Sequence, residues 1–318
     1  MYLSIIIPVY NCENLVSRCI ESIELQGDYC FEIILVNDGS KDNSLDVCLQ
    51  LSKRYKNIRV FSHRNKGTST TRNRGLSESK GDYVWFVDAD DYIPNGFFSK
   101  LFYVLKAKQP DVLTFNYQYI TRKGETYREL YIEERFMKCI DFLRDNPCMF
   151  AATKVYKKSS LGSLKFLDGL KNIEDFLFNI QYLSSHEYIY TLSCSGYVYD
   201  HTNENSTSLN RSLRNLIKTS SDSITVHTTI LNELKHINDN NMLEVVQAQL
   251  NYSIAGHLYS LVAFYNTKRL KKTIKMYEEM GLYPIKHVNK KRAKYVIHFM
   301  NHKRLLIMFS FLYKFRFR

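Results

Sequence analysis

The feature that most restricts the fold of this chain is a short apolar run, Tyr83 to Val87, that ends abruptly in Asp88-Ala89-Asp90-Asp91. A buried strand that ends in this way brings acidic groups to its own carboxyl end, the edge where open α/β sheets bind ligands. Carboxylates so close together need a positive partner, and hard divalent cations prefer such oxygen ligands. The run therefore indicates a metal that holds a phosphorylated ligand. An acidic turn or helix N-cap is the simpler alternative.

Apolar segments with strand and helix periodicity alternate on both sides of this run. The pattern predicts strands over 3–9, 31–36, 58–61 and 83–87, with helices over 15–25, 45–55 and 71–79 between them. Further along it predicts a helix over 94–106, a strand over 111–120 with an edge hairpin near Gly124, a short helix over 136–143, an extended segment over 149–156, a helix over 172–183 and one or two strands over 188–199. Such alternation is typical of an α/β fold with a mostly parallel sheet and right-handed crossovers.

Beyond about Ser206 only helical periodicity remains, so we expect one domain over 1–205 and a helical region over 206–318. The chain has a net charge of +12, but ten Lys and Arg and no acidic residue follow Glu279, which leaves about +2 for the rest. This tail mixes cations with aromatic and aliphatic residues, which favours contact with an anionic membrane. Packing of the tail on the domain over 1–205 and contact with nucleic acid are the alternatives, and of these we do not expect nucleic acid.

Cysteine usage and the apolar segments predict the location. The seven cysteines contain no CxxC pair, which argues against a disulfide framework or a zinc site. Met1-Tyr2-Leu3-Ser4 has no basic region before the first apolar run, and no apolar stretch reaches the roughly 20 residues that span a bilayer. We therefore expect a cytoplasmic protein that is peripheral on the inner face of the membrane.

Two loops carry polar side chains to the edge where the acidic run ends. Asp38 follows the second strand and can accept a hydrogen bond from a ribose hydroxyl or a base, although an Asx-turn is the simpler interpretation. Arg64, Lys66, Arg72 and Arg74 lie in or beside the loop before the helix over 71–79, where they can bind phosphate or form a solvated basic face. No glycine-rich phosphate loop is present, so a metal on Asp90 is the more plausible phosphate holder.

Four ordered motifs resemble those of the family 2 glycosyltransferases. They are Ser4-Ile5-Ile6-Ile7-Pro8-Val9-Tyr10-Asn11, then Val36-Asn37-Asp38-Gly39-Ser40-Lys41-Asp42, then Asn65-Lys66-Gly67 with Thr71-Arg72-Asn73-Arg74-Gly75-Leu76, then Gly81 to Asp91. The resemblance is dense to about residue 100 and thinner to about 205. It implies a GT-A fold with a nucleotide-binding half over about 1–100 and an acceptor half over about 101–205.

The resemblance also implies roles for individual residues. Pro8, Val9, Tyr10 and Asp38 would contact the nucleotide, with Glu13 a weaker candidate, and Arg72 would lie near the base or diphosphate. Asp88 and Asp90 form a D-x-D motif, in which Asp90 would bind Mg²⁺ or Mn²⁺ and Asp88 would share ribose and metal. Asp91 is expected on the acceptor side or as a helix cap, not as a ligand.

The same resemblance implies where the proton goes. The general base would be Asp175, supported by Glu174 in the same helix start, and the family often has Gly where this chain has Ile173. Two acids favoured by a helix N-terminus are the simpler interpretation. His201, in a late loop like the family's, is a candidate metal or phosphate ligand, with a surface histidine as the alternative.

Together these features predict a metal-dependent, inverting glycosyltransferase. It would move a sugar from a nucleotide-diphospho-sugar, UDP-linked by family analogy, to a hydroxyl of a growing surface glycan such as capsule, O-antigen or lipooligosaccharide. The acceptor would be a glycan or a lipid-linked glycan. The alternative from another class is a non-catalytic basic α/β protein that docks to membrane or nucleic acid.

Overall fold

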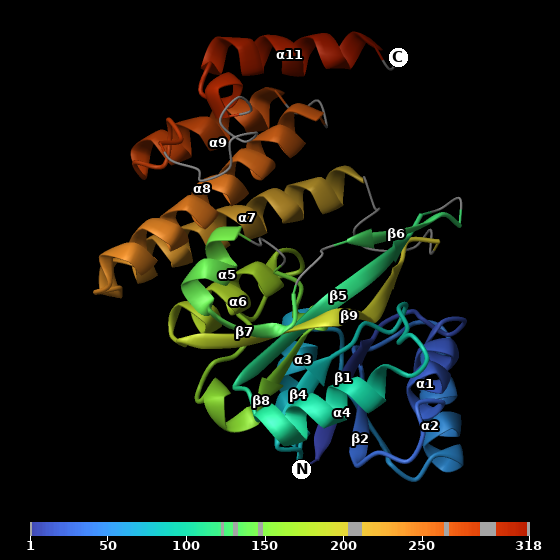
Figure 1. Ribbon diagram of the computed structural model, residues 1–318. Helices are drawn as coiled ribbons and strands as arrows, with labels where there is room; N and C mark the ends of the chain where they lie inside the picture. The colour runs from blue at the N-terminus through green and yellow to red at the C-terminus, as the bar shows by residue number, and fades with distance from the viewer. Residues whose placement is uncertain are drawn as a thin grey trace. The chain divides into compact units, whose positions relative to one another are not determined.

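The structure, a computed structural model, describes residues 2–121, 124–129, 133–145, 149–202, 212–263, 267–286 and 297–316. The chain forms two compact units, each shown in Figure 1. The first contains Met1–Cys139 and Cys148–Ser212, and the second contains Ile140–Pro147 and Leu213–Arg318. The boundary expected near residue 205 falls in 203–211, outside the described residues.

The first unit is built on one sheet. Its strands are β1 (Leu3–Val9), β2 (Phe31–Asn37), β3 (Ile58–Ser62), β4 (Tyr83–Phe86), β5 (Val112–Ile120), β6 (Thr126–Glu129), β7 (Arg135–Lys138), β8 (Lys154–Lys157) and β9 (Tyr188–Asp200). Their order within the described residues is β3-β2-β1-β4-β8-β5-β9-β7, with β6 paired to β5 (Figure 1). The hairpin expected near Gly124 is the β5–β6 pair.

Strand directions bring several strand ends to one edge. Strands β1, β2, β3 and β4 pair in parallel. Strand β8 is antiparallel to both β4 and β5, and β5 is parallel to β9. Therefore β5 and β9 point the same way as β4. The carboxyl ends of all six strands lie at the same edge, and the predicted α/β fold with a mostly parallel sheet is confirmed.

Helices cover both faces of this sheet. They are α1 (Val16–Glu24), α2 (Ser44–Arg54), α3 (Thr68–Glu78), α4 (Phe97–Lys108) and α6 (Glu174–Ser184). Alternate residues of β1 form one hydrophobic cluster with buried residues of α1, α2 and α4. On the other face, α3 approaches β1 so closely that a Cβ on Gly75 would lie 2.2 Å from Ile6 Cγ2. Phe86 packs there against Phe178 of α6, with ring centroids 6.1 Å apart.

Two local predictions need correction. The helix expected over 136–143 is a strand, β7, followed by α5 (Cys139–Asp145). Phe136 lies opposite Tyr190 across the β7–β9 pair, with ring centroids 4.9 Å apart, and this cross-strand contact overrides the helical pattern. The segment 149–156 is not fully extended, because a 3₁₀ turn (η1, Ala151–Thr153) precedes β8.

The second unit is helical, as predicted. It includes α7 (Leu213–Glu233), α8 (Asn240–Ala263), α9 (Thr267–Glu279) and α11 (Lys303–Arg316). A buried polar network joins α7, α8 and α9, because the Tyr277 hydroxyl lies 2.7 Å from Nδ1 of both His227 and His257. Burial lowers the pKa of His257 to about 4, so this network is uncharged. Among the described helices, none has both the length and the apolarity that crossing a bilayer requires.

Candidate functional site

The candidate site begins at the carboxyl ends of β1, β2 and β4. The Asp38 N–H donates to the Val9 carbonyl at 2.8 Å, and the Val87 N–H donates to the Ile6 carbonyl at 3.0 Å. The ladders therefore continue to the last residues of the strands. The residues that follow, among them the D-x-D motif, lie side by side at this edge.

Arg72 of α3 joins three carboxylates. Its Nη1 donates to Glu174 Oε1 at 2.9 Å and to Asp175 Oδ1 at 2.6 Å, and its Nη2 donates to Asp88 Oδ1 at 2.9 Å. The Arg72 side chain is only 4% exposed, and its guanidinium stacks over the Phe166 ring. The family resemblance predicts Arg72 near the base or diphosphate, but in this structure its guanidinium bonds to protein carboxylates. The proposed base and the D-x-D motif therefore share one cation.

Burial and mutual repulsion shift the pKa values in this cluster. Burial works to lower the pKa of Arg72, but the carboxylates of Asp175, Asp88 and Glu174 reverse that effect and raise it. Burial, followed by the charge of Asp175, raises the pKa of Glu174 to about 7. Burial also raises the pKa of Asp175, against the opposing effect of Arg72. Perturbed carboxylates of this kind are typical of functional sites.

Asp175 keeps capacity to accept a proton. Its Oδ1 is bound by Arg72, and its Oδ2 accepts from the Ala151 N–H at 2.9 Å. An ionised carboxylate has about four lone-pair sites, so one donor on each oxygen leaves room for another. The Asp175 side chain is 18% exposed.

The residue before these two acids has a strained backbone. Ile173 is the N-cap of α6 and has φ 53°, ψ 19°, in the left-handed region. A β-branched residue is rarely found there, whereas glycine adopts this conformation without cost. Although Ile173 stands where the family often has glycine, the backbone here keeps the left-handed turn that glycine favours. It is the turn that directs Glu174 and Asp175 toward Arg72.

Tyr197 of β9 fixes the D-x-D segment from the opposite side to Arg72. Its hydroxyl accepts from the Asp88 N–H at 3.1 Å and donates to Asp91 Oδ2 at 2.5 Å. Asp91 Oδ1 accepts from the Asp200 N–H at 2.8 Å, and Asp91 is fully buried. Asp91 is therefore neither a helix cap nor accessible to an acceptor. It connects the ends of β4 and β9.

Arg18 of α1 completes this frame. Its Nη2 donates to the Asp90 carbonyl at 2.6 Å, and its Nη1 forms an ion pair with Asp200 Oδ2 at 2.6 Å. Its guanidinium also lies over the Tyr92 ring, 4.9 Å from the centroid. The main chain of the D-x-D segment is thus held at Asp88 by Tyr197 and at Asp90 by Arg18.

Asp38 binds the loop that precedes α3. Its Oδ1 accepts from the Lys66 N–H at 2.7 Å, and its Oδ2 accepts from the Gly67 N–H at 3.0 Å. The side chain is buried. Gly39 allows this contact, because it has φ 66° and a Cβ there would lie 2.6 Å from the Asn65 nitrogen. In this structure the Asp38 oxygens therefore bind protein main chain, whereas the side chain that closes the turn is that of Asn37, whose Oδ1 accepts from the Ser40 N–H at 3.3 Å.

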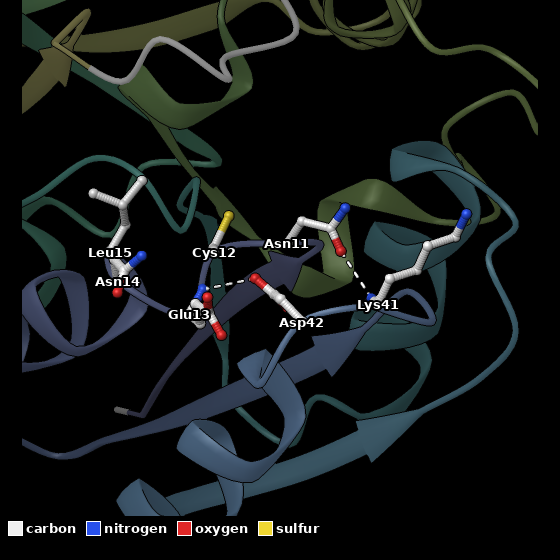
Figure 2. Close-up of a pocket in the computed structure, with 7 residues that line it drawn as sticks. All are labelled: Asn11, Cys12, Glu13, Asn14, Leu15, Lys41 and Asp42. Atoms are coloured by element: carbon white, nitrogen blue, oxygen red, sulfur yellow. Dashed lines mark hydrogen bonds between the residues drawn. The ribbon is translucent and has the colours of Figure 1, made fainter.

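The other expected nucleotide contacts lie along the β1–α1 connection. Tyr10 is 43% exposed and Pro8 is partly buried, but the Val9 side chain is fully buried, so only its main chain is available to a ligand. Glu13 Oε2 accepts from both nitrogens of Asn43, each at 2.8 Å. A hollow of about 430 Å³ adjoins this connection (Figure 2), lined by Asn11, Cys12, Glu13, Asn14, Leu15, Lys41 and Asp42.

His201 lies after β9, against aromatic side chains. Its Nδ1 is 2.9 Å from the Tyr119 hydroxyl, and its ring contacts the rings of Tyr119 and Tyr199 with centroids 4.5 and 4.4 Å apart. It is partly buried, which differs from the surface histidine considered as the alternative.

The D-x-D carboxylates suit a hard divalent cation in number and chemistry. Within the described ranges no three His, Cys, Asp or Glu side chains gather as a metal site. Mg²⁺ is usually held by one or two carboxylates plus the phosphates of a substrate, so a complete protein cage is not required. Asp88 and Asp90 are both partly exposed, and only one oxygen of Asp88 bonds Arg72. These oxygen donors fit Mg²⁺ or Mn²⁺ together with a diphosphate.

The sheet order and the acidic strand end define an α/β fold of the GT-A class, in which a Rossmann-like half precedes further strands. Residues 4–164, half of the chain, match the family model "Glycosyl transferase family 2". The chain belongs to this family, as the four sequence motifs predicted.

Individual relatives and solved structures agree with this assignment. Glycosyltransferase GlyA of Streptococcus pneumoniae is 31% identical over 210 residues, which are 62% of this chain and 30% of GlyA. Poly(ribitol-phosphate) beta-glucosyltransferase of Bacillus spizizenii is 38% identical over 130 residues, 39% of this chain and 20% of that protein. The chain therefore matches less than a third of the length of either relative. TarS 1–349 of S. aureus, in complex with UDP-GlcNAc, superposes with a TM-score of 0.70 at 20% identity, covering 98% of this chain and 89% of TarS 1–349.

Sequence reasoning missed the frame around the D-x-D motif. Arg18, Tyr197 and Asp200 contact this segment, yet Arg18 occupies a helix and Tyr197 a strand, without a local motif. The available signal was the topology. The predicted strands over 83–87 and 188–199 run in the same direction, so Asp200, which follows the second strand, comes to the same edge of the sheet as the D-x-D motif.

Proposed function

We propose that this protein is a metal-dependent, inverting glycosyltransferase that uses a UDP-linked sugar and a glycan hydroxyl as acceptor. The observation that carries the proposal is the shared guanidinium of Arg72, which binds Asp88 of the D-x-D motif and Asp175 together. A donor diphosphate bound at Asp88 and an acceptor hydroxyl bound at Asp175 would therefore lie next to each other. Family membership supports the chemistry, and the complex of TarS with UDP-GlcNAc supports the donor class.

In the proposed reaction, Asp175 accepts the proton of the acceptor hydroxyl while that oxygen attacks the anomeric carbon. The new carbon–oxygen bond forms as the bond from the anomeric carbon to the diphosphate breaks, with inversion and without a covalent intermediate. Arg72 holds Asp175 in position and stabilises its ionised form. Asp90 and Asp88 would hold Mg²⁺ or Mn²⁺, which supplies positive charge for the leaving diphosphate. His201 remains a candidate ligand for metal or phosphate.

The remaining proposed contacts are with the nucleotide. The base and ribose are proposed to bind to Pro8, Tyr10, the main chain of Val9, and Asp38. Glu13 would act indirectly, because its carboxylate accepts from Asn43 and so fixes the loop that contains it. Because Asp38 binds the N–H groups of Lys66 and Gly67, we infer that it presents this loop to the nucleotide as well as accepting a hydrogen bond from it.

The acceptor is proposed to be a surface glycan. Relatives named as glycosyltransferases, one of which is a poly(ribitol-phosphate) beta-glucosyltransferase, support an acceptor of this class. A non-catalytic basic binding protein, the alternative from another class, has no use for the carboxylates that surround Arg72.

The C-terminal helix is proposed to lie on an anionic membrane surface. The exposed residues Leu305, Met308 and Phe309 recur at helical spacing on α11. Arg304 is exposed at the start of this helix, beside Lys303, whose ammonium group pairs with Glu278 Oε1 at 2.8 Å. Apolar area combined with cations favours an anionic interface. The basic run Lys290–Tyr295 lies outside the described residues. Flotation with phosphatidylglycerol vesicles should be lost in L305S/M308S and retained in Tyr259→Ser, which changes an exposed side chain on α8.

The experiment that tests the proposed activity is a donor panel. The wild-type protein is incubated with nucleotide sugars and Mn²⁺, and release of the nucleoside diphosphate is measured alongside thermal stabilisation by each nucleoside diphosphate. We expect hydrolysis of a UDP-sugar and Mn²⁺-dependent stabilisation by UDP. Absence of both across all nucleotides would favour the non-catalytic alternative.

A further inference from the structure

Phe150 is an exposed aromatic residue on an unusually well-fixed main chain. Its ring is 45% exposed. Its carbonyl accepts from the Thr153 N–H at 3.3 Å, from Thr153 Oγ1 at 2.9 Å and from Lys154 Nζ at 3.2 Å. Lys154 is fully buried, so an ammonium group is removed from water and directed at this carbonyl. A large apolar ring is thus presented to solvent by a rigid turn.

This rigid turn also holds the proposed base. The residue after Phe150 is Ala151, whose N–H donates to Asp175 Oδ2 at 2.9 Å. One short turn therefore fixes the carboxylate and the exposed ring together. A ligand that rests on Phe150 can place a hydroxyl at Asp175.

Phe150 belongs to a row of aromatic side chains at the ends of β5 and β9. Its ring centroid lies 5.8 Å from that of Tyr117 and 5.9 Å from that of Tyr199. Tyr199 in turn contacts His201 and Tyr119, with centroids 4.4 and 6.1 Å away. We call these five residues the aromatic row.

The aromatic row lies at the edge that carries the D-x-D motif, but on different strands. Strands β5 and β9 end at the same edge as β4, and the Asp200 N–H at the end of β9 donates to Asp91 Oδ1. The donor diphosphate is assigned to the end of β4, with His201 as a candidate ligand, so the other members of the aromatic row are left for the second substrate. The side chains of the row present aromatic rings and tyrosine hydroxyls, which suit an uncharged ligand better than a polyanion.

We propose that the aromatic row binds the acceptor as a pyranose ring, stacked on Phe150, with the attacking hydroxyl directed at Asp175. The C–H groups on one face of a pyranose carry partial positive charge and match the negative face of an aromatic ring. This inference rests on the proposed function, since it assigns the acceptor class at that site.

The test compares transfer with hydrolysis in one assay. The full-length wild-type protein receives the UDP-sugar that it hydrolyses, Mn²⁺, and in turn methyl glucoside, methyl galactoside, methyl N-acetylglucosaminide or free ribitol. Transfer product and hydrolysed sugar are quantified together for wild type, F150A, F150L, F150Y and Tyr103→Ala. Tyr103, 69% exposed on α4, is the matched control for removing an exposed aromatic.

We expect transfer to at least one methyl pyranoside. In F150A and F150L the transfer-to-hydrolysis ratio should fall roughly tenfold, because both lose the flat aromatic face. In F150Y and in the Tyr103 control it should stay close to that of wild type. Melting temperatures report whether each variant is folded, and F150L, which keeps an apolar side chain at this position, keeps the test decisive if F150A does not fold.

Three results would overturn the proposal: an unchanged ratio in F150A and F150L, a loss in F150Y equal to that in F150A, or transfer to ribitol but to no methyl pyranoside. Hydrolysis of a UDP-sugar without transfer to any pyranoside would reject the pyranose site and leave the proposed activity standing. Failure to hydrolyse any nucleotide sugar would contradict the proposed activity itself, together with this inference.

Discussion

The guanidinium of Arg72 binds the carboxylate of Asp175 at 2.6 Å, across 103 residues of sequence. The same side chain binds Asp88 at 2.9 Å. Arg72 is therefore the cation on which both halves of the candidate site depend.

Removing that cation should destabilise the fold. Arg72→Met leaves Asp88, Glu174 and Asp175 near one another without a positive partner, and breaking a buried ion pair in this way costs about 3–5 kcal/mol. We expect the free energy of unfolding, measured with urea, to fall by a large amount at pH 8. The decrease should be smaller at pH 5, because more of the carboxylates are protonated there. Arg54→Met, which removes an exposed pair with Glu21, is the control and should change stability little. Equal losses in the two variants would contradict the role given to Arg72.

Glu174 should make stability depend on pH. Its pKa rises from its ordinary 4.5 to about 7 in the folded protein. Between these values the folded state binds more protons than the unfolded state, so the contribution to stability is complete below pH 4.5 and is lost as pH rises through 7. Glu174→Gln mimics the protonated form, so the free energy of unfolding of this variant should fall less as the pH rises. At pH 8 it should exceed that of wild type by about 1–3 kcal/mol. Parallel wild-type and variant curves of unfolding free energy from pH 5 to 8 would reject this explanation.

Removing the Tyr197 hydroxyl should weaken ligand binding at the proposed metal-binding segment, Asp88 to Asp91, whereas removing the hydroxyl of another buried tyrosine should not. Tyr197→Phe removes the partner of the Asp88 N–H and of Asp91 Oδ2, and an unsatisfied buried group costs about 1–3 kcal/mol. Tyr182→Phe is the matched control, because its hydroxyl binds the Asp111 carbonyl and Ser160 in the same unit. We expect both variants to be destabilised, but only Tyr197→Phe to weaken Mn²⁺-dependent binding of UDP, measured by calorimetry. Equal UDP affinities in the two variants would show that Tyr197 has only a general structural role.

At position 173 glycine should be tolerated better than alanine. Both substitutions remove the isoleucine side chain beyond Cβ, but only glycine adopts φ 53° without strain. A non-glycine residue in the left-handed region costs about 1–3 kcal/mol, partly offset by the extra freedom of glycine in the unfolded chain. Ile173→Gly should therefore be more stable than Ile173→Ala by about 1 kcal/mol in urea unfolding. An alanine variant as stable as the glycine variant would contradict the strain.

Much of the fold was predictable because its signals are local. The apolar runs at β1, β2 and β4 end in polar residues, and each end marks the correct edge. The local pattern predicted a helix where β7 is found. Phe136 pairs there with Tyr190, a residue distant in the sequence, and a contact of this kind leaves no local pattern.

The candidate site was predictable in its acids but not in their partners. Asp88, Asp90, Glu174 and Asp175 stand out as paired acids, yet nothing in the sequence shows that one arginine joins three of them. Asp38 stands out as a residue that could face a ligand, but no local pattern indicates that its oxygens also accept from the Lys66 and Gly67 N–H groups. The frame made by Arg18, Tyr197 and Asp200 depends on strands that meet only after folding.

The most direct test of the central claim is Asp175→Asn, assayed with the UDP-sugar identified in the donor panel and with its acceptor. Asparagine keeps the shape of the side chain but cannot serve as a general base. We expect transfer to fall about a hundredfold or more while the affinity for UDP changes little, with Glu174→Gln retaining more transfer than Asp175→Asn. A folded Asp175→Asn protein that transfers sugar at the wild-type rate would show that Asp175 is not the base.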